Sequence, residues 1–197
     1  MVLLGLDLSL NCSGWTVARA ELGGLVQATE AGVIVTDAKH PLESRLDAVA
    51  SDLETLYALH GFEHAVAERF IPIVGRGRTV EHPDGTVETT RGTTSDTLFR
   101  LACVHGTALL TLRRQGLPLP ALSYINRSHA AKVVVGDGRA GKAEVRAFME
   151  RTFPDLAWPK AIAKREGVAD ALLVLLCHAR ETLGAFPASS VEGRPVL

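Results

Sequence analysis

The stretch VLLGLDLSLNCSGWTVARA, residues 2–20, decides the expected fold. Residues 2–6 form an apolar run, and a second run at residues 15–20 follows a polar segment that contains turn-forming Asn and Gly. A third run, at residues 32–36, follows two consecutive glycines. Three short strands in close succession predict an antiparallel meander. Asp7 stands at the end of the first strand.

Helices and strands alternate in the rest of the chain. Apolar residues at helical spacing follow Pro41 and precede an apolar strand at residues 64–67, which predicts a right-handed crossover into a fourth, parallel strand. Ser95 is expected to cap a second helix that ends at Gly116, ahead of a fifth strand at residues 121–125. Two more helices are expected, at residues 142–153 and 169–183. The order βββαβαβα predicts an α/β fold with a five-stranded mixed sheet flanked by helices.

One domain accounts for most of the 197 residues. We expect it to span residues 1–184 and to be followed by a loose tail, residues 185–197, that is rich in Pro, Gly and Ser. Within residues 72–94, a Pro-Asp-Gly turn separates two runs of strand-like alternation, which predicts an inserted β-hairpin. This hairpin is either a variable surface loop or an arm that contacts a partner or DNA.

Charge and composition limit the classes of function. The formal net charge of −1 excludes a protein that coats nucleic acid by bulk electrostatics, so any nucleic-acid surface must be a local patch. The apolar N-terminus is too short for a membrane span and lacks the features of a signal peptide, which favours a cytoplasmic protein without membrane contact. The odd number of widely spaced cysteines predicts neither a disulfide framework nor a zinc knuckle. The basic residues Arg76, Arg78, Arg91, Lys132, Arg139 and Lys142 are candidates for such a patch, although charge runs on helices are more often solvated faces.

Carboxylates follow apolar segments at three distant places. Asp7 and Glu68 each end an apolar strand, where an ionised carboxylate is costly unless a cation pairs with it. If these strands are parallel neighbours, both acids lie at the same edge of the sheet. Asp170 opens an apolar helix, and Glu166 shares its helix face if the helix has begun by then. A turn cap is the alternative role for Asp7, and a helix cap is the alternative for Asp170.

Converging carboxylates repel one another in a low-dielectric cleft unless cations neutralise them. Ligand sets made only of oxygen favour Mg²⁺ or Mn²⁺ over zinc. Two such ions can activate a water and stabilise the leaving oxygen of a phosphodiester. The acids therefore predict a metal-dependent nuclease.

Four segments carry a resemblance to a known family: LGLDLSLNCSGW, AVAERF, VVVGDGRAGKAEV and GVADALLVLLCHA. Their order and spacing resemble the bacterial RuvC Holliday-junction resolvases, which have an RNase H-like fold. The resemblance spans residues 2–179 without the hairpin, and its most specific parts are the Gly-rich motif ending at Val145 and the Ala-Asp-Ala-Leu segment with the downstream His178.

The resemblance implies a homodimer that cuts symmetric strands of a four-way DNA junction. It implies Mg²⁺ or Mn²⁺, two ions per site, held by Asp7, Glu68, Asp170 and one further acid. The Lys142 position would lie near the scissile phosphate, where an ammonium group can offset developing negative charge.

Two positions depart from the family pattern. Gly167 stands three residues before the last acid, where the family commonly has an acid or His, so Glu166 is the candidate for the fourth ligand. In the family an aromatic residue stands three residues after the second acid. In this chain Phe70 stands two residues after Glu68. A junction-opening role and a buried core position both remain open for Phe70.

The added hairpin suits a phage or prophage enzyme that acts in the cytoplasm of the host.

Other interpretations were weighed. Residues 136–141 match the dinucleotide fingerprint, but the preceding apolar run is too short for its strand and no strand follows the next helix. Actin-like and sugar kinases also start with an Asp on the first strand, but they need two such domains. A non-catalytic junction-binding protein, and a nuclease for forks, flaps or RNA–DNA hybrids, remain alternatives.

Overall fold

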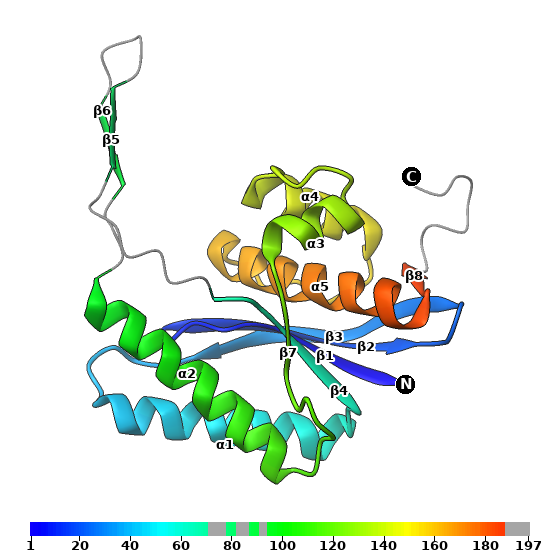
Figure 1. The fold of residues 1–197 in the computed structure, drawn as a ribbon, viewed down its shortest axis with the longest axis horizontal. Coiled ribbons are helices and arrows are strands. Elements are labelled where there is room, and N and C mark those ends of the chain that lie inside the picture. Colours follow the sequence, from blue (N-terminus) through cyan, green and yellow to red (C-terminus); the bar gives the residue numbers. More distant parts are fainter. Residues whose placement is uncertain (71–77, 82–86, 91–93, 188–197) are drawn as a thin grey trace.

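A six-stranded mixed sheet with helices on both faces forms the body of the protein in the computed structural model (Figure 1). The structure describes residues 1–70, 78–81, 87–90 and 94–187, with backbone alone for 78–81 and 87–90. The strand order is β7-β4-β1-β2-β3-β8. The strands are β1 (Val2–Asp7), β2 (Cys12–Ala20), β3 (Leu25–Val35), β4 (His64–Glu68), β7 (Ser123–Ile125) and β8 (Phe186–Pro187).

Strand β1 is the centre of the sheet. It pairs antiparallel with β2 and parallel with β4, and β2 continues into the antiparallel pair with β3. The predicted meander and the predicted parallel fourth strand are therefore confirmed. Leu3, Leu4 and Leu6 are fully buried because helices cover both faces of the sheet.

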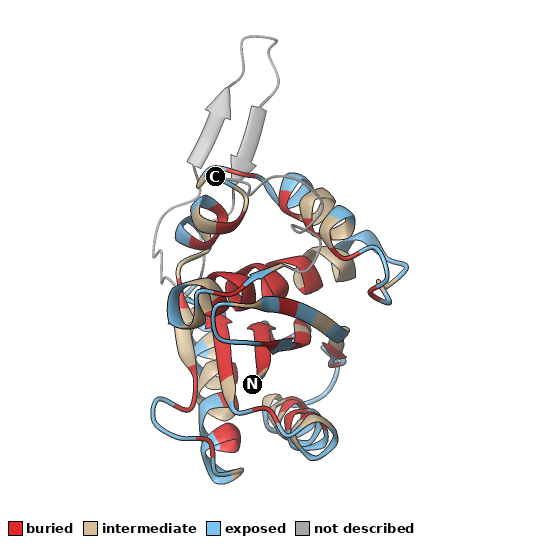
Figure 2. Cartoon of the chain, turned by 90° about the vertical axis from the view of Figure 1, so that its right-hand side faces the viewer, coloured by how far each residue is buried: buried red, intermediate tan, exposed pale blue. Residues whose placement is uncertain are grey.

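Helices α1 (Leu42–His60) and α2 (Ser95–Arg114) cover one face of the sheet, and α3 (Arg127–Val134), α4 (Lys142–Thr152) and α5 (Ile162–Leu183) cover the other (Figure 1). Two apolar clusters result, one on each side of the sheet. Figure 2 shows the buried residues concentrated in the strands and in α5, at the centre of the molecule.

Helix α5 packs unusually close to the sheet because glycines face it. A Cβ atom at Gly5 of β1 would lie 2.3 Å from the carbonyl oxygen of Ala171. A Cβ atom at Gly14 of β2 would lie 2.2 Å from the backbone of Gly167. The two strands and the helix therefore approach one another backbone to backbone, next to the positions of Asp7 and Asp170.

Several predicted boundaries need correction. The sheet has six strands rather than five, because Phe186–Pro187, which were expected in a loose tail, pair with β3. Helix α5 begins at Ile162 rather than at residue 169; its first turn is largely exposed, so it lacks the apolar spacing that marks a buried helix. Thr94, not Ser95, caps α2, since its hydroxyl accepts the backbone N–H of Thr97.

Helix α3 was not predicted. Residues 133–135 look like a short strand in the sequence, but Val134 ends this helix and Val135 is its C-cap. The helix begins after Asn126, whose side chain accepts the N–H of Ser128. This helix has only eight residues and three buried ones, too few to show a periodicity that distinguishes helix from strand.

The predicted hairpin has paired strands. Strands β5 (Arg78–Glu81) and β6 (Val87–Thr90) form a separate antiparallel pair. Arg76, Arg91 and the Pro-Asp-Gly turn lie outside the described residues, as does the side chain of Arg78. Among the helices that are described, none is both long and apolar enough to cross a lipid bilayer.

We predict that Gly5→Ala destabilises the protein by about 1–3 kcal/mol, because the new methyl group must push β1 away from the backbone of α5. Urea denaturation followed by circular dichroism measures the change. Gly106→Ala is the matched control: nothing lies within 4 Å of its Cβ position in α2, so that variant should be neutral or more stable by up to about 1 kcal/mol. Equal midpoints for Gly5→Ala and the unchanged protein would contradict the close-packing argument.

Candidate active site

Asp7, Glu68 and Asp170 meet at one edge of the sheet. In the parallel pair of β1 and β4, Leu6 is opposite Ala67, so the next residues, Asp7 and Glu68, leave the two strands side by side. Asp170 reaches them from α5, and its negative charge raises the pKa of both other carboxyls. The convergence that the sequence predicted is present in the structure.

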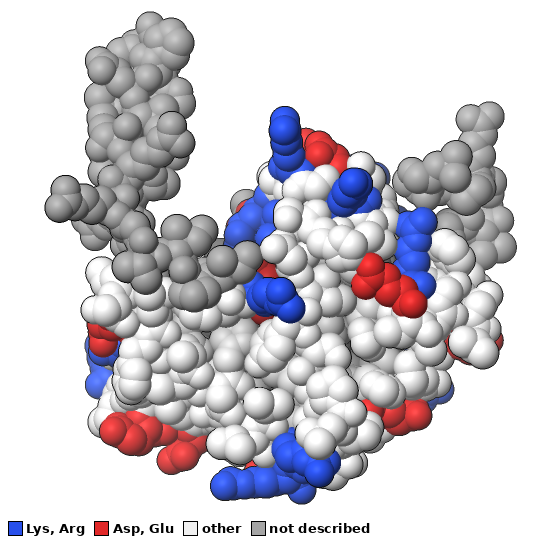
Figure 3. Space-filling model, in the orientation of Figure 1, with Lys and Arg blue, Asp and Glu red and all other residues white. Residues whose placement is uncertain are grey.

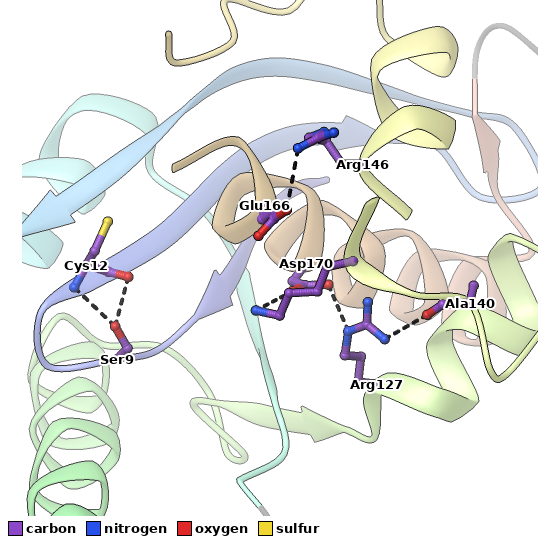
Figure 4. A network of polar contacts seen from close by, with 8 residues as sticks. Ser9, Cys12, Arg127, Ala140, Arg146, Glu166 and Asp170 are labelled. Carbon is purple, nitrogen blue, oxygen red and sulfur yellow. Dashed lines mark hydrogen bonds and ion pairs between the residues drawn. The ribbon is translucent and has the colours of Figure 1, made fainter. Parts of the chain in front are cut away.

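The turn after β1 does not use Asp7 as its cap. The Ser9 hydroxyl accepts the N–H of Cys12 at 3.1 Å and donates to the Cys12 carbonyl at 2.8 Å (Figure 4). The Ser13 hydroxyl accepts the N–H of Ser9 at 3.0 Å. Buried Arg45 donates to the carbonyl of Leu10 at 3.0 Å. Serine and arginine side chains therefore fix the turn, and the Asp7 carboxylate is not needed to cap it.

Asp170 does not cap a helix either. Helix α5 begins eight residues earlier, at Ile162, so Asp170 lies inside the helix, where it is 2% exposed. Its Oδ2 atom is buried and accepts no hydrogen bond from the described residues. Its contact there is an ion pair with Lys142, whose Nζ atom is 3.4 Å away, and a divalent cation would suit the same oxygen.

Burial and mutual repulsion disfavour the ionised forms of these acids. Burial, and then the charge of Asp170, raises the pKa of Asp7 to about 6. Burial, and then the charges of Asp7 and Asp170, raises the pKa of Glu68 to about 7. Positive charge brought to this place would stabilise both carboxylates. The donor set consists of oxygen atoms, which suits Mg²⁺ or Mn²⁺.

Two basic side chains border the acids. The Nζ atom of Lys142, the first residue of α4, lies 3.4 Å from Oδ2 of Asp170. Partial burial lowers the pKa of Lys142, but the charges of Asp170 and Asp7 outweigh it, so the pKa lies above the ordinary value. Lys142 therefore stays protonated at neutral pH, as a cation beside the carboxylates.

Arg127 is the second cation, and sequence reasoning missed it. Its Nε donates to Oδ1 of Asp170 at 3.0 Å, and its Nη1 donates to the carbonyl of Ala140 at 3.0 Å (Figure 4). Arg127 thus ties Asp170 to the segment just before Lys142. One signal could have revealed it: β7 is parallel to β4 and ends at Ile125, so the residues that follow it emerge at the same edge as Glu68.

Glu166 lies on α5 one turn before Asp170, as expected, but it pairs with a different residue. Its Oε1 lies 3.4 Å from Nη1 of Arg146 on α4 (Figure 4). Gly167, the departure from the family pattern, is the residue closer to the acids: its Cβ position would lie 3.6 Å from Oδ2 of Asp7. The structure thus places three carboxylates together and leaves Glu166 in an ion pair with a neighbouring helix.

Phe70, Lys132 and Arg139 are the other candidate residues whose side chains the structure describes. Phe70 is half-buried and stacks on His105 of α2, with ring centroids 5.9 Å apart. Lys132 and Arg139 are exposed, on α3 and in the loop that follows it. Figure 3 shows basic side chains gathered over the helices on this side of the sheet, with acidic ones among them. The basic side chains form a local patch, as expected for a chain whose net charge is −1.

Comparison with known proteins establishes the family. A RuvC from Sphingopyxis alaskensis, named a crossover junction endodeoxyribonuclease, is 33% identical over 181 residues, which cover 91% of this chain and 97% of that protein. The chain belongs to the RuvC family. A second RuvC, from Erythrobacter litoralis, is 30% identical over 182 residues, covering 90% of this chain and 92% of the relative. No family model matches the chain.

Solved RuvC structures have the same fold. The RuvC of Thermus thermophilus superposes with a TM-score of 0.66 at 19% identity, covering 93% of this chain and 97% of that one. The same enzyme in complex with Holliday junction substrate gives a TM-score of 0.67 at 17% identity, covering 91% and 93%. The RNase H-like α/β fold expected from the RuvC resemblance is confirmed.

The raised pKa values of Asp7 and Glu68 predict how the stability of the metal-free protein depends on pH. The folded state binds these protons more tightly than the unfolded state, whose pKa values are near 3.8 and 4.5. The contribution of these two groups to the free energy of unfolding is therefore greatest below pH 4. That contribution is lost as the pH rises to about 7. Urea denaturation in EDTA between pH 5 and pH 8 measures this slope.

The variant Glu68→Gln should flatten that slope and be more stable than the unchanged protein at pH 8 by about 1–3 kcal/mol. Glu144→Gln, which changes an exposed acid at the start of α4, is the control and should leave the slope unchanged. If Glu68→Gln has the same pH profile as the unchanged chain, the three carboxylates do not repel one another as described.

Proposed function

We propose that this chain resolves four-way DNA junctions by metal-dependent phosphodiester hydrolysis, with Asp7, Glu68 and Asp170 as the ligands of Mg²⁺ or Mn²⁺. The observation that carries the assignment of residues is the convergence of these three acids, one buried and two partly buried, beside Lys142. Membership of a family whose relatives are crossover junction endodeoxyribonucleases supports the reaction. A solved relative bound to Holliday junction substrate supports the choice of DNA.

The chain's own residues have distinct roles in this proposal. Three carboxylates offer six oxygens, enough to share between two ions. When bound, the ions supply Lewis-acid stabilisation of the scissile phosphate and the leaving oxygen. Lys142 holds its ammonium group where a phosphate oxygen can approach, and offsets negative charge that develops during cleavage. Arg127 keeps Oδ1 of Asp170 engaged, while Oδ2 lies 3.4 Å from the ammonium group of Lys142.

The binding surface follows from the same geometry. We assign phosphate contacts to Lys132 and Arg139, which are exposed near Lys142, and to the hairpin residues Arg76, Arg78 and Arg91. Phe70 is half-buried on His105, a position from which it can still meet a base. A homodimer would present two such sites to symmetric strands. Its substrate would place the enzyme in the cytoplasm of a bacterium or of a phage-infected host.

The central test is Asp7→Asn, which we expect to abolish cleavage of a four-way junction while DNA affinity stays within a few-fold. The amide keeps the shape of the side chain but removes a charge that a divalent ion needs. Junctions, forks, flaps and RNA–DNA hybrids are offered side by side in Mg²⁺ and in Mn²⁺, with Asp137→Asn, an exposed loop acid, as the control. Paired symmetric nicks in the junction alone are the expected result.

Undiminished cleavage by Asp7→Asn would refute the proposed metal ligands. Binding of junctions without cleavage by the unchanged protein would support the non-catalytic alternative. Preference for forks, flaps or hybrids would keep the nuclease and change its substrate.

A second prediction concerns the fourth ligand. We expect Gly167→Asp to bind Mg²⁺ at least about tenfold more tightly than the unchanged chain, because the new carboxylate would reach the cluster. A Cβ atom at residue 167 would lie 3.6 Å from the backbone of Gly14 and 3.6 Å from Oδ2 of Asp7, which are ordinary contact distances. Calorimetric titration with Mg²⁺ measures the affinity.

Gly167→Asn is the matched control, since it adds the same bulk without the charge. Glu166→Gln should leave Mg²⁺ affinity unchanged if the ion pair with Arg146 is the role of Glu166. A large loss of Mg²⁺ affinity in Glu166→Gln would instead make Glu166 the fourth ligand.

A further inference from the structure

A second cluster of potential ligands lies between α3 and α5, apart from the three acids. His129 of α3 meets Cys177 and Glu181 of α5, and one ligand atom from each lies within 4.8 Å of the other two. The Nε2 atom of His129 is 2.6 Å from Oε1 of Glu181. No step of the proposed DNA cleavage uses these residues.

The backbone holds these three side chains together. Cys177 and Glu181 are four residues apart on α5, so they share one face of that helix. His129 comes from α3, which packs along α5. Arg180 is engaged elsewhere, because its guanidinium donates to the carbonyl of Val133 and lies 5.4 Å from the ring of Phe186. The imidazole, thiol and carboxyl groups can therefore face a common point.

The chemistry of this cluster differs from that of the active site. Nitrogen, sulfur and oxygen ligands together suit a borderline-soft ion such as Zn²⁺, whereas Mg²⁺ prefers oxygen alone. Ligand atoms around a tetrahedral Zn²⁺ are roughly 3–4 Å apart, so small side-chain rotations would bring the three atoms into range. Three protein ligands leave one position for water.

Access to the cluster is also suitable. The side chains of His129 and Glu181 are 51% and 45% exposed, while Cys177 lies buried beneath them. An ion can therefore arrive from solvent, meet the exposed pair first and then reach the thiol. From these observations we propose that His129, Cys177 and Glu181 form a binding site for Zn²⁺ or a similar transition-metal ion, independent of the Mg²⁺ site.

Binding would exchange a proton for the ion. Burial, and then the Glu181 carboxylate, raises the pKa of the Cys177 thiol to about 12 in the metal-free protein. The thiol is therefore protonated at neutral pH, and the metal takes the place of its proton, which goes to solvent. Helices α3 and α5 are already joined by the Arg127–Asp170 pair and by the Arg180–Val133 hydrogen bond, and the ion would strengthen this connection and so brace the helix that positions Arg127.

Cobalt titration of the full chain tests the site. Co²⁺ replaces Zn²⁺ in such sites, and a cysteine ligand produces a thiolate-to-cobalt charge-transfer band in the near ultraviolet. The titration uses Asp7→Asn protein in excess Mg²⁺, so that the carboxylate cluster does not compete for Co²⁺. We expect the band to appear with one equivalent of Co²⁺ and to disappear on addition of one equivalent of Zn²⁺.

The variants identify the ligands. Cys177→Ser should remove the band, and His129→Gln should weaken the affinity for Co²⁺ more than about 100-fold, since it removes a direct ligand. Cys12→Ser and Cys103→Ser change the other two cysteines and should keep the band. Cys177 is buried, so Cys177→Ser could fail to fold. His129 is exposed, and His129→Gln therefore tests the site independently of that risk. Three results would overturn the proposal: no band when all three ligands are intact, a band that persists in Cys177→Ser, or an unchanged Co²⁺ affinity in His129→Gln. His129 and Glu181 would then be a surface ion pair.

Discussion

Repulsion among three carboxylates at one edge of the sheet is the constraint on which the rest of this structure depends. Asp170 is buried, Asp7 and Glu68 are partly buried, and the charge of Asp170 makes ionisation of both other acids less favourable. Such a group of acids is tolerable only with positive charge nearby. Lys142 and Arg127 supply part of that charge within the chain. Divalent ions would supply the remainder. The same three carboxylates therefore destabilise the metal-free fold and provide the ligands for the proposed chemistry.

Close backbone packing makes this arrangement possible. Gly5 and Gly14 let α5 approach the two strands without intervening side chains. Because the helix lies so close, Asp170 can reach acids that stand at strand ends. The same closeness explains why Gly167 matters: it contacts Gly14 of β2, and a Cβ atom at Gly167 would lie 3.6 Å from Oδ2 of Asp7.

Helix α5 thereby carries two different sets of donor atoms. In its first half Asp170 joins an oxygen-only cluster that suits hard cations. Two to three turns later Cys177 and Glu181 meet His129 in a mixed cluster that suits a softer one. Helix α3 contributes to both, through Arg127 and His129. This short helix is therefore the element that links the two places.

The sequence by itself determined the strand order of the meander, the parallel fourth strand and the acids at strand ends, because apolar runs and the edge rule for parallel strands are local patterns. It did not reveal the last strand, since Phe186–Pro187 pair only once β3 offers an edge. It did not reveal Arg127, because α3 has no periodic signal, nor the partner of Glu166, which is Arg146 of another helix. The spacing of the cysteines predicted no zinc site, and only the packing of α3 on α5 brings His129 to Cys177. Helices and strands depend on residues that are neighbours in the sequence, so local patterns predict them. Contacts between side chains that are distant in the sequence form only when the helices pack together.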